Sequence, residues 1–155
     1  MPSTDLQHIA RAVALALEAE AAGNLPVGAL LVLDGERVAE GRNAVLRPHY
    51  DPGRHAEIEA IRALAPALWP RAREMTLYTT LEPCMMCMGA VLLHGIGRVV
   101  YGAPDLLGGC THSLAHLPPY YAKARVPEFH GPIDDERCRA LYERVARAFA
   151  ELPCA

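Results

Sequence analysis

The 155-residue chain is 52% hydrophobic and carries 15 basic and 18 acidic side chains, a net charge of −3, which argues weakly against an extended nucleic-acid surface. Its length suits one domain with a sizeable core, so we expect a single domain over residues 1–155. No apolar run reaches the roughly 18 residues of a membrane helix, and the N-terminus has no basic and apolar signal-peptide regions, so we expect a soluble cytoplasmic protein without membrane contact.

The first half of the chain predicts a helix, two strands and a second helix. Apolar residues recur at helical spacing near the N-terminus: Leu6, Ile9, Val13 and Leu17. This stripe predicts a helix that ends at "AAGN". The stretch "PVGALLVLDGERVAEG" predicts two strands around an Asp34–Gly35 turn, a strong hairpin pattern. Apolar positions from Ile58 to Leu68 predict a second helix that stops at Pro70.

The second half continues the alternation. The segment "MTLYTTL" predicts a strand, and Pro83 is expected to start the third helix, where its missing amide proton costs nothing. Two further strands are predicted from "GRVVYGA" and, more weakly, from "ARVPEF", whose proline suits a sheet edge. The last helix is marked by Cys138, Leu141, Tyr142, Val145 and Phe149. This order predicts a layered α/β domain.

Five cysteines form an odd set at uneven spacing: Cys84, Cys87, Cys110, Cys138 and Cys154. Such a set is unlike the disulfide framework of a small secreted domain, so metal binding or catalysis outranks disulfides. Cys84 and Cys87 share one face of a helix start, where the helix dipole stabilises thiolates. A catalytic zinc would need one more protein ligand and leave a position for water. The other three cysteines are expected to be packed or incidental thiols.

The third ligand candidate is His55 in "HAEIEAIRAL", with Glu57 two residues on, near a helix start. H-x-E alone is too short to carry weight. Together with the proline and the cysteine pair, however, it completes H-x-E…P-C-x-x-C. This pattern is typical of zinc-dependent nucleobase deaminases.

The sequence resembles the cytidine deaminase-like superfamily, most closely the branch of bacterial tRNA adenosine deaminases, guanine deaminases and fungal-type cytosine deaminases. The likeness runs from about Leu25 to Phe149 and includes "LPVGALLV", "LYTTLEPCMMCMGA" and "GRVVYGAPD". It implies a three-layer α/β/α fold with a central mixed sheet of about five strands. It also implies one catalytic zinc per chain on His55, Cys84 and Cys87, with Glu57 as a proton shuttle and not a ligand.

The resemblance extends the site to substrate contacts. Asn43 occupies the position of the family's substrate-contacting asparagine, and the backbone near Ala56 and Cys84 would hold the base. Asp105 matches an aspartate that lies near substrate in the tRNA-editing branch. Two structural interpretations stay open, in which Asn43 accepts an unusual turn conformation and Asp105 caps the segment after its strand.

The resemblance also implies a homodimer packed through the exposed face of the zinc-bearing helix. Met85, Met88 and Leu92 are the candidates for this contact. All three could equally face the protein's own core, and the sequence does not separate the two arrangements.

The substrate is the open question. Residues 101–114 resemble tRNA adenosine deaminases, which implies conversion of adenosine to inosine in an anticodon loop. Two features argue against tRNA, because the C-terminal segment lacks a basic run and the loop from Asn43 to His55 is one residue longer than usual. That loop region contains Arg42, Arg47, His49 and Arg54, which would either meet a phosphate or form solvated surface. We therefore expect a free nucleoside or nucleobase, with tRNA as the alternative partner.

Two hypotheses from other classes compete with a nucleoside or nucleobase deaminase. A non-enzymatic zinc-binding module would usually need four protein ligands, often from two C-x-x-C pairs, and this chain has one such pair. A thioredoxin-like redox pair is the third option. Neither has a use for Glu57 beside His55.

Overall fold

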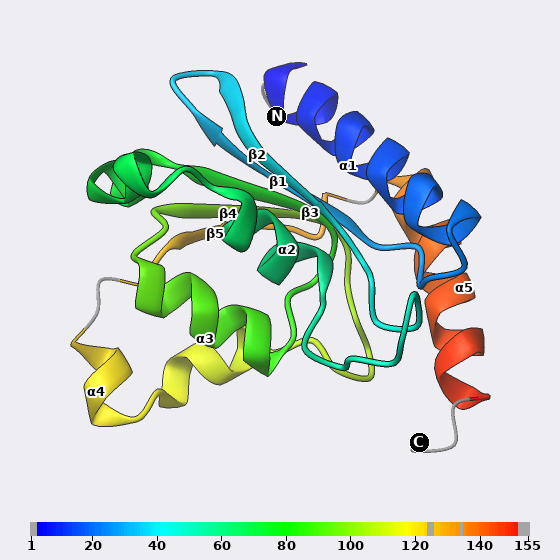
Figure 1. The fold of residues 1–155 in the computed structure, drawn as a ribbon. Helices are drawn as coiled ribbons and strands as arrows, with labels where there is room; N and C mark the ends of the chain where they lie inside the picture. The colour runs from blue at the N-terminus through cyan, green and yellow to red at the C-terminus, as the bar shows by residue number, and fades with distance from the viewer. Residues whose placement is uncertain (1–2, 124–125, 134, 152–155) are drawn as a thin grey trace.

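A five-stranded sheet lies between two layers of helices in the computed structural model, which describes residues 3–123, 126–133 and 135–151 (Figure 1). The strands are β1 (Gly28–Leu33), β2 (Glu36–Arg42), β3 (Thr76–Leu81), β4 (Arg98–Ala103) and β5 (Glu128–His130). The helices are α1 (Ser3–Ala21), α2 (Ala56–Ala63), α3 (Met85–His94), α4 (Pro119–Ala122) and α5 (Glu136–Ala150), with 3-10 helices η1 (Pro66–Glu74) and η2 (Thr111–His116). No helix in these ranges is long and apolar enough to cross a bilayer.

The sheet is mixed, in the order β2-β1-β3-β4-β5. Strand β1 pairs antiparallel with β2 and β3, whereas β3, β4 and β5 run parallel. Figure 1 shows α2 and α3 on one face, and α1 and α5 side by side on the other. The expected three-layer α/β/α fold with about five strands is therefore confirmed.

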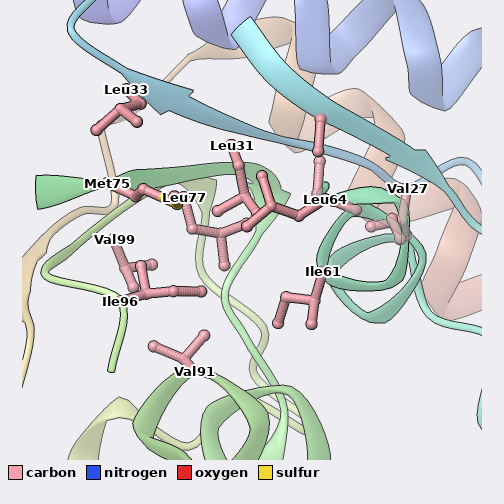
Figure 2. Packing of buried hydrophobic residues seen from close by; sticks show 14 of the residues in the cluster. Val27, Leu31, Leu33, Ile61, Leu64, Met75, Leu77, Val91, Ile96 and Val99 are labelled. Carbon is pink, nitrogen blue, oxygen red and sulfur yellow. The ribbon is translucent and has the colours of Figure 1, made fainter. Parts of the chain in front are cut away.

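Alternating side chains on the strands build a separate apolar cluster on each face. Leu31 and Leu77 belong to the cluster under α2 and α3, whereas Leu30 and Tyr78 belong to the cluster under α1 and α5. In Figure 2, Val91 of α3 points up toward the sheet side of the first cluster. Packing of this cluster sets the distance between the sheet and helices α2 and α3.

The hairpin between β1 and β2 has the predicted turn. Asp34 and Gly35 both have positive φ angles, 54° and 81°. Two consecutive left-handed residues match the right-handed twist of the flanking strands, which is why Asp-Gly is favoured there.

Helix α1 packs through small residues that its pattern of large residues did not reveal. Leu6 and Leu17 are each 46% exposed, while Ala12 and Ala16 are fully buried. A side chain at Gly28 of β1 would collide with the backbone of both alanines. Strand and helix backbones thus approach too closely for leucine at the contact.

The predicted end of the second helix is wrong. Helix α2 stops at Ala63, and Pro70 lies inside η1. The cause is Pro66, because a proline disfavours helical angles at the preceding residue, and Ala65 is extended with a ψ of 129°. Pro83 also lies just before helix α3, whose N-cap is Cys84.

The residues expected at a dimer contact are divided. Met85 is 72% exposed on the first turn of α3, whereas Met88 and Leu92 are buried against Cys110. Cys110 and Cys138 are both buried in apolar clusters, as expected for packed thiols. Cys154 lies outside the described residues. The homodimer stays a prediction, for which sedimentation of the purified protein is the test.

Gly41 sets the distance between β2 and α2, since an added Cβ there would collide with the backbone of Ala56 and Ala60. We predict that Gly41→Ala lowers the free energy of unfolding by about 1–3 kcal/mol, because the helix must shift to admit the methyl group. Urea unfolding measures this. Gly89→Ala on α3 is the matched control, since its Cβ would meet nothing within 4 Å; equal midpoints for the two variants would contradict the prediction.

Candidate active site

The starts of α2 and α3 bring His55, Cys84 and Cys87 together. His55 is the N-cap of α2 and Cys84 the N-cap of α3, and neither side chain caps its own helix. Instead, His55 Nδ1 lies 3.5 Å from Cys84 Sγ and 3.6 Å from Cys87 Sγ. The ligand atoms of all three residues lie within 4.8 Å of one another.

This geometry fits zinc. Tetrahedral zinc has Zn–S bonds of about 2.3 Å and Zn–N bonds of about 2.0–2.1 Å, which places the nitrogen and each sulfur roughly 3.5–3.6 Å apart. The distances from His55 to the two cysteines match this separation. One nitrogen and two sulfurs form a donor set that zinc prefers, with a fourth position left for water.

Contacts within the cluster also favour the thiolate form of Cys84. A hydrogen bond from Cys87, together with one from His55, lowers the pKa of Cys84 to about 4. The bond to Cys84 also raises the pKa of His55. Both the contact with Cys84 and burial raise the pKa of Cys87, since two adjacent thiolates repel each other. A bound cation would remove this repulsion and stabilise both thiolates.

Glu57 lies two residues after His55, in the first turn of α2, and is only 3% exposed. Its Oε1 accepts a hydrogen bond from the Thr79 hydroxyl at 3.2 Å, and its Oε2 lies 3.5 Å from Cys87 Sγ. Burial raises the pKa of Glu57 above its usual range, because a charged carboxylate loses its hydration there. Burial therefore favours the protonated form of this carboxyl group.

A cavity opens next to the cluster. It is lined by Leu25, Val27, Asn43, His55, Glu57, Leu81, Glu82, Cys84, Asp105, Leu107, Gly108, Tyr142, Val145, Ala146 and Phe149. The polar groups of the cluster therefore meet a mostly apolar enclosure supplied by the segment before β1, the end of β3, the loop after β4 and helix α5. A planar, mostly apolar ring with a few polar edges fits such a lining.

The three expected substrate contacts have different surroundings. Asn43 is 3% exposed, and its Oδ1 accepts a hydrogen bond from Val45 N at 3.1 Å. Its Nδ2 has no partner among the described residues. Ala56 is fully buried behind His55 and does not line the cavity. Asp105 lines the cavity, but its Oδ1 also accepts from Leu107 N and Gly108 N at 3.0 Å each.

A family model for the cytidine and deoxycytidylate deaminase zinc-binding region matches residues 2–103, which include the three ligand candidates and Glu57. The chain belongs to this deaminase family. Together with the His55, Cys84 and Cys87 cluster, the match identifies the protein as a zinc-dependent deaminase with one zinc ion.

Several relatives of this deaminase are named as enzymes that act on tRNA. It is 41% identical to the tRNA-specific adenosine deaminase of Bacillus subtilis over 73% of this chain and 70% of that one. It is 41% identical to the tRNA-specific adenosine deaminase of Haemophilus influenzae over 82% of this chain and 74% of the relative. A structure from a study of A-to-I editing by tRNA:A34 deaminases matches 88% of this chain and 99% of its own, with a TM-score of 0.77 and 31% identity. Our expectation of a free nucleoside or nucleobase substrate, with tRNA disfavoured, is contradicted by these relatives.

Sequence reasoning missed several residues of the deaminase's site. Thr79 contacts Glu57 from β3, and Glu82 lines the cavity one residue before Pro83. Tyr142 and Phe149 of α5 also line the cavity, although their helical spacing had only marked them as part of the last helix. The "TTLEPC" stretch was the available signal for the first two, since it places polar side chains directly before a ligand.

The donor set yields a first test of the site. Purified deaminase should contain about one zinc per chain, and Cys84→Ser and His55→Ala should each lose most of it, because three protein ligands leave none in reserve. Elemental analysis of the folded proteins measures this. Cys138→Ser, a buried cysteine outside the cluster, is the control. Full zinc content in both ligand variants would exclude the assignment.

Proposed function

We propose that this deaminase converts adenosine to inosine in tRNA, at the wobble position of the anticodon. The likeness to the tRNA-specific adenosine deaminases of two bacteria is the observation that carries the proposal. Adenosine deamination consumes one water, replaces the C6 amino group with oxygen and releases ammonia.

The chemistry divides between zinc and the chain's own groups. His55, Cys84 and Cys87 would hold the zinc, which when bound activates a water molecule as nucleophile near neutral pH. Glu57 takes a proton at its carboxylate, delivers it to a ring nitrogen and returns a proton to the departing amine. Thr79 holds one Glu57 oxygen at 3.2 Å, and the other oxygen lies 3.5 Å from Cys87 Sγ, beside the proposed zinc ligands.

The remaining contacts orient the nucleoside. The Asn43 amide nitrogen is free to donate into the cavity, while its oxygen is held by Val45 N. Cys84 lines the cavity, so its backbone would contact the base, whereas Ala56 does not line the cavity. Asp105 combines a structural and a substrate role, because its Oδ1 shapes the loop and the residue lines the cavity.

A groove on the other side of Asn43 suits an RNA backbone. Asn43 lines both this groove and the catalytic cavity, and its neighbour Ala44 lines the groove. Of the arginines along the groove, Arg11, Arg42 and Arg54 pair with carboxylates. Arg47 has no ion pair among the described residues, although Asn24 Oδ1 holds its backbone N at 2.9 Å. A fixed backbone carrying an unpaired guanidinium is suited to a phosphate.

The decisive experiment compares substrates at moderate salt. An anticodon stem-loop with a wobble adenosine should be converted to the inosine form, while adenosine, guanine, cytosine and cytidine are turned over at least roughly 100-fold more slowly, because a free base forgoes the contacts outside the cavity. Inosine and ammonia are measured. Turnover of a small substrate with the stem-loop left intact would overturn the proposal.

Arg47→Ala supplies a second arm of this comparison. Losing one phosphate contact should weaken stem-loop binding and reduce the salt slope by roughly 0.7. Arg62→Ala is the control, since Arg62 is exposed outside the groove and pairs only weakly with Glu59 at 3.6 Å. Equal slopes in all three proteins would remove Arg47 from the RNA contact.

Glu57 is tested separately. Glu57→Ala and Glu57→Gln should keep their zinc and lose roughly 10²–10⁴-fold in turnover, because proton transfer contributes about that much. Single-turnover rates on the stem-loop and zinc content are both measured. Glu36→Gln, on the exposed edge of the hairpin, is the matched control. Near-normal turnover in Glu57→Gln would refute the shuttle role.

A further inference from the structure

Glu82 joins three separate groups of one loop. The residue follows β3 and lies two positions before Cys84. Its Oε2 accepts a hydrogen bond from Asp105 N at 3.2 Å. Its Oε1 accepts from Thr111 N at 3.1 Å and from the Thr111 hydroxyl. One carboxylate thus binds both ends of the segment 105–111.

The middle of this loop packs against the same carboxylate. A Cβ at Gly109 would collide with Glu82 Oε2, so only glycine lets the loop backbone approach this closely. Gly109 also forms an isolated antiparallel bridge with Cys84, and Cys110 N donates to Pro83 O at 3.1 Å. The loop is therefore attached along the segment that presents a zinc ligand.

Apolar packing contributes little to holding the loop. No side chain of residues 105–109 is buried, and Leu106 and Leu107 are 81% and 76% exposed. Cys110 is the first buried side chain after Ala103. In a segment with so little buried apolar area, polar contacts decide whether it keeps one conformation.

The loop forms a wall of the catalytic cavity through Asp105, Leu107 and Gly108. We propose that Glu82 is a positioning residue that holds the loop 105–111 in its substrate-binding conformation. Glu82 acts on substrate affinity, whereas His55, Glu57 and Cys87 lie on α2 and α3 and are positioned without it. The substrate used in the test rests on the proposed tRNA activity, but the conformational part of the proposal does not.

Glu82→Gln is the main variant, since it keeps the shape and replaces one accepting oxygen with an NH₂ group that faces a backbone N–H. Zinc content and the urea midpoint should stay at wild-type values. The KM for the anticodon stem-loop should rise roughly tenfold or more, as expected for lost hydrogen bonds to a charged acceptor, with kcat within about threefold. Amide hydrogen exchange in residues 105–111 should become faster, with no change in α2 and α3.

Gly109→Ala approaches the same contact from the loop and should reproduce both the KM increase and the faster exchange. Gly89→Ala on α3 is its control, with space for the added methyl group. Glu36→Gln is the charge control for Glu82→Gln, because it removes an exposed carboxylate far from the cavity.

The outcomes separate this proposal from the proposed function. Unchanged loop exchange in Glu82→Gln overturns the positioning role whatever the substrate is. Loss of zinc, or a fall in kcat at constant KM, also overturns it, because either would place Glu82 in the metal centre or the chemistry. A wild-type protein inactive on the stem-loop refutes the tRNA activity alone, and the exchange experiment then decides the role of Glu82.

Discussion

Convergence of two helix N-termini is the constraint on which the site depends. The three donors come from helices whose starts are 29 residues apart in sequence, yet His55 Nδ1 and Cys84 Sγ lie 3.5 Å apart. Two features hold this arrangement: the apolar cluster under α2 and α3, and the close approach of α2 to β2 at Gly41. The positive helix ends add electrostatic stabilisation to the thiolates. The packing that forms the fold therefore also positions the metal ligands.

The same convergence buries Glu57. A carboxylate that is 3% exposed is costly to keep charged, and the fold retains it beside a metal site with a single hydroxyl donor, Thr79. Burial raises its pKa, so the position of Glu57 on the first turn of α2 tunes the group that we propose as the proton shuttle. Folding stability is lost here in exchange for a carboxyl group whose pKa lies above its usual range.

The sequence predicted what local rules and fixed spacing control. Asp34–Gly35 gave the hairpin because only certain residues accept two positive φ angles, and the zinc donors followed from motif spacing. The predictions were wrong where a tertiary contact or an overlooked proline determined the structure. Pro66 ended α2 early, and the contact of α1 with β1 uses Ala12 and Ala16, whose small size carries a packing role that hydropathy does not register.

Substrate choice was misjudged for a related reason. Net charge averages over the whole surface, whereas binding of an RNA phosphate depends on which cations lack a carboxylate partner. Within the described residues, salt bridges occupy Arg11, Arg42 and Arg54 but not Arg47. Part of the cavity wall comes from α5 and the loop 105–111, which contain none of the motif residues. The motif thus identifies the reaction, because its residues perform the chemistry. We propose that specificity is set by cavity walls whose shape depends on contacts, such as those of Glu82, between distant parts of the chain.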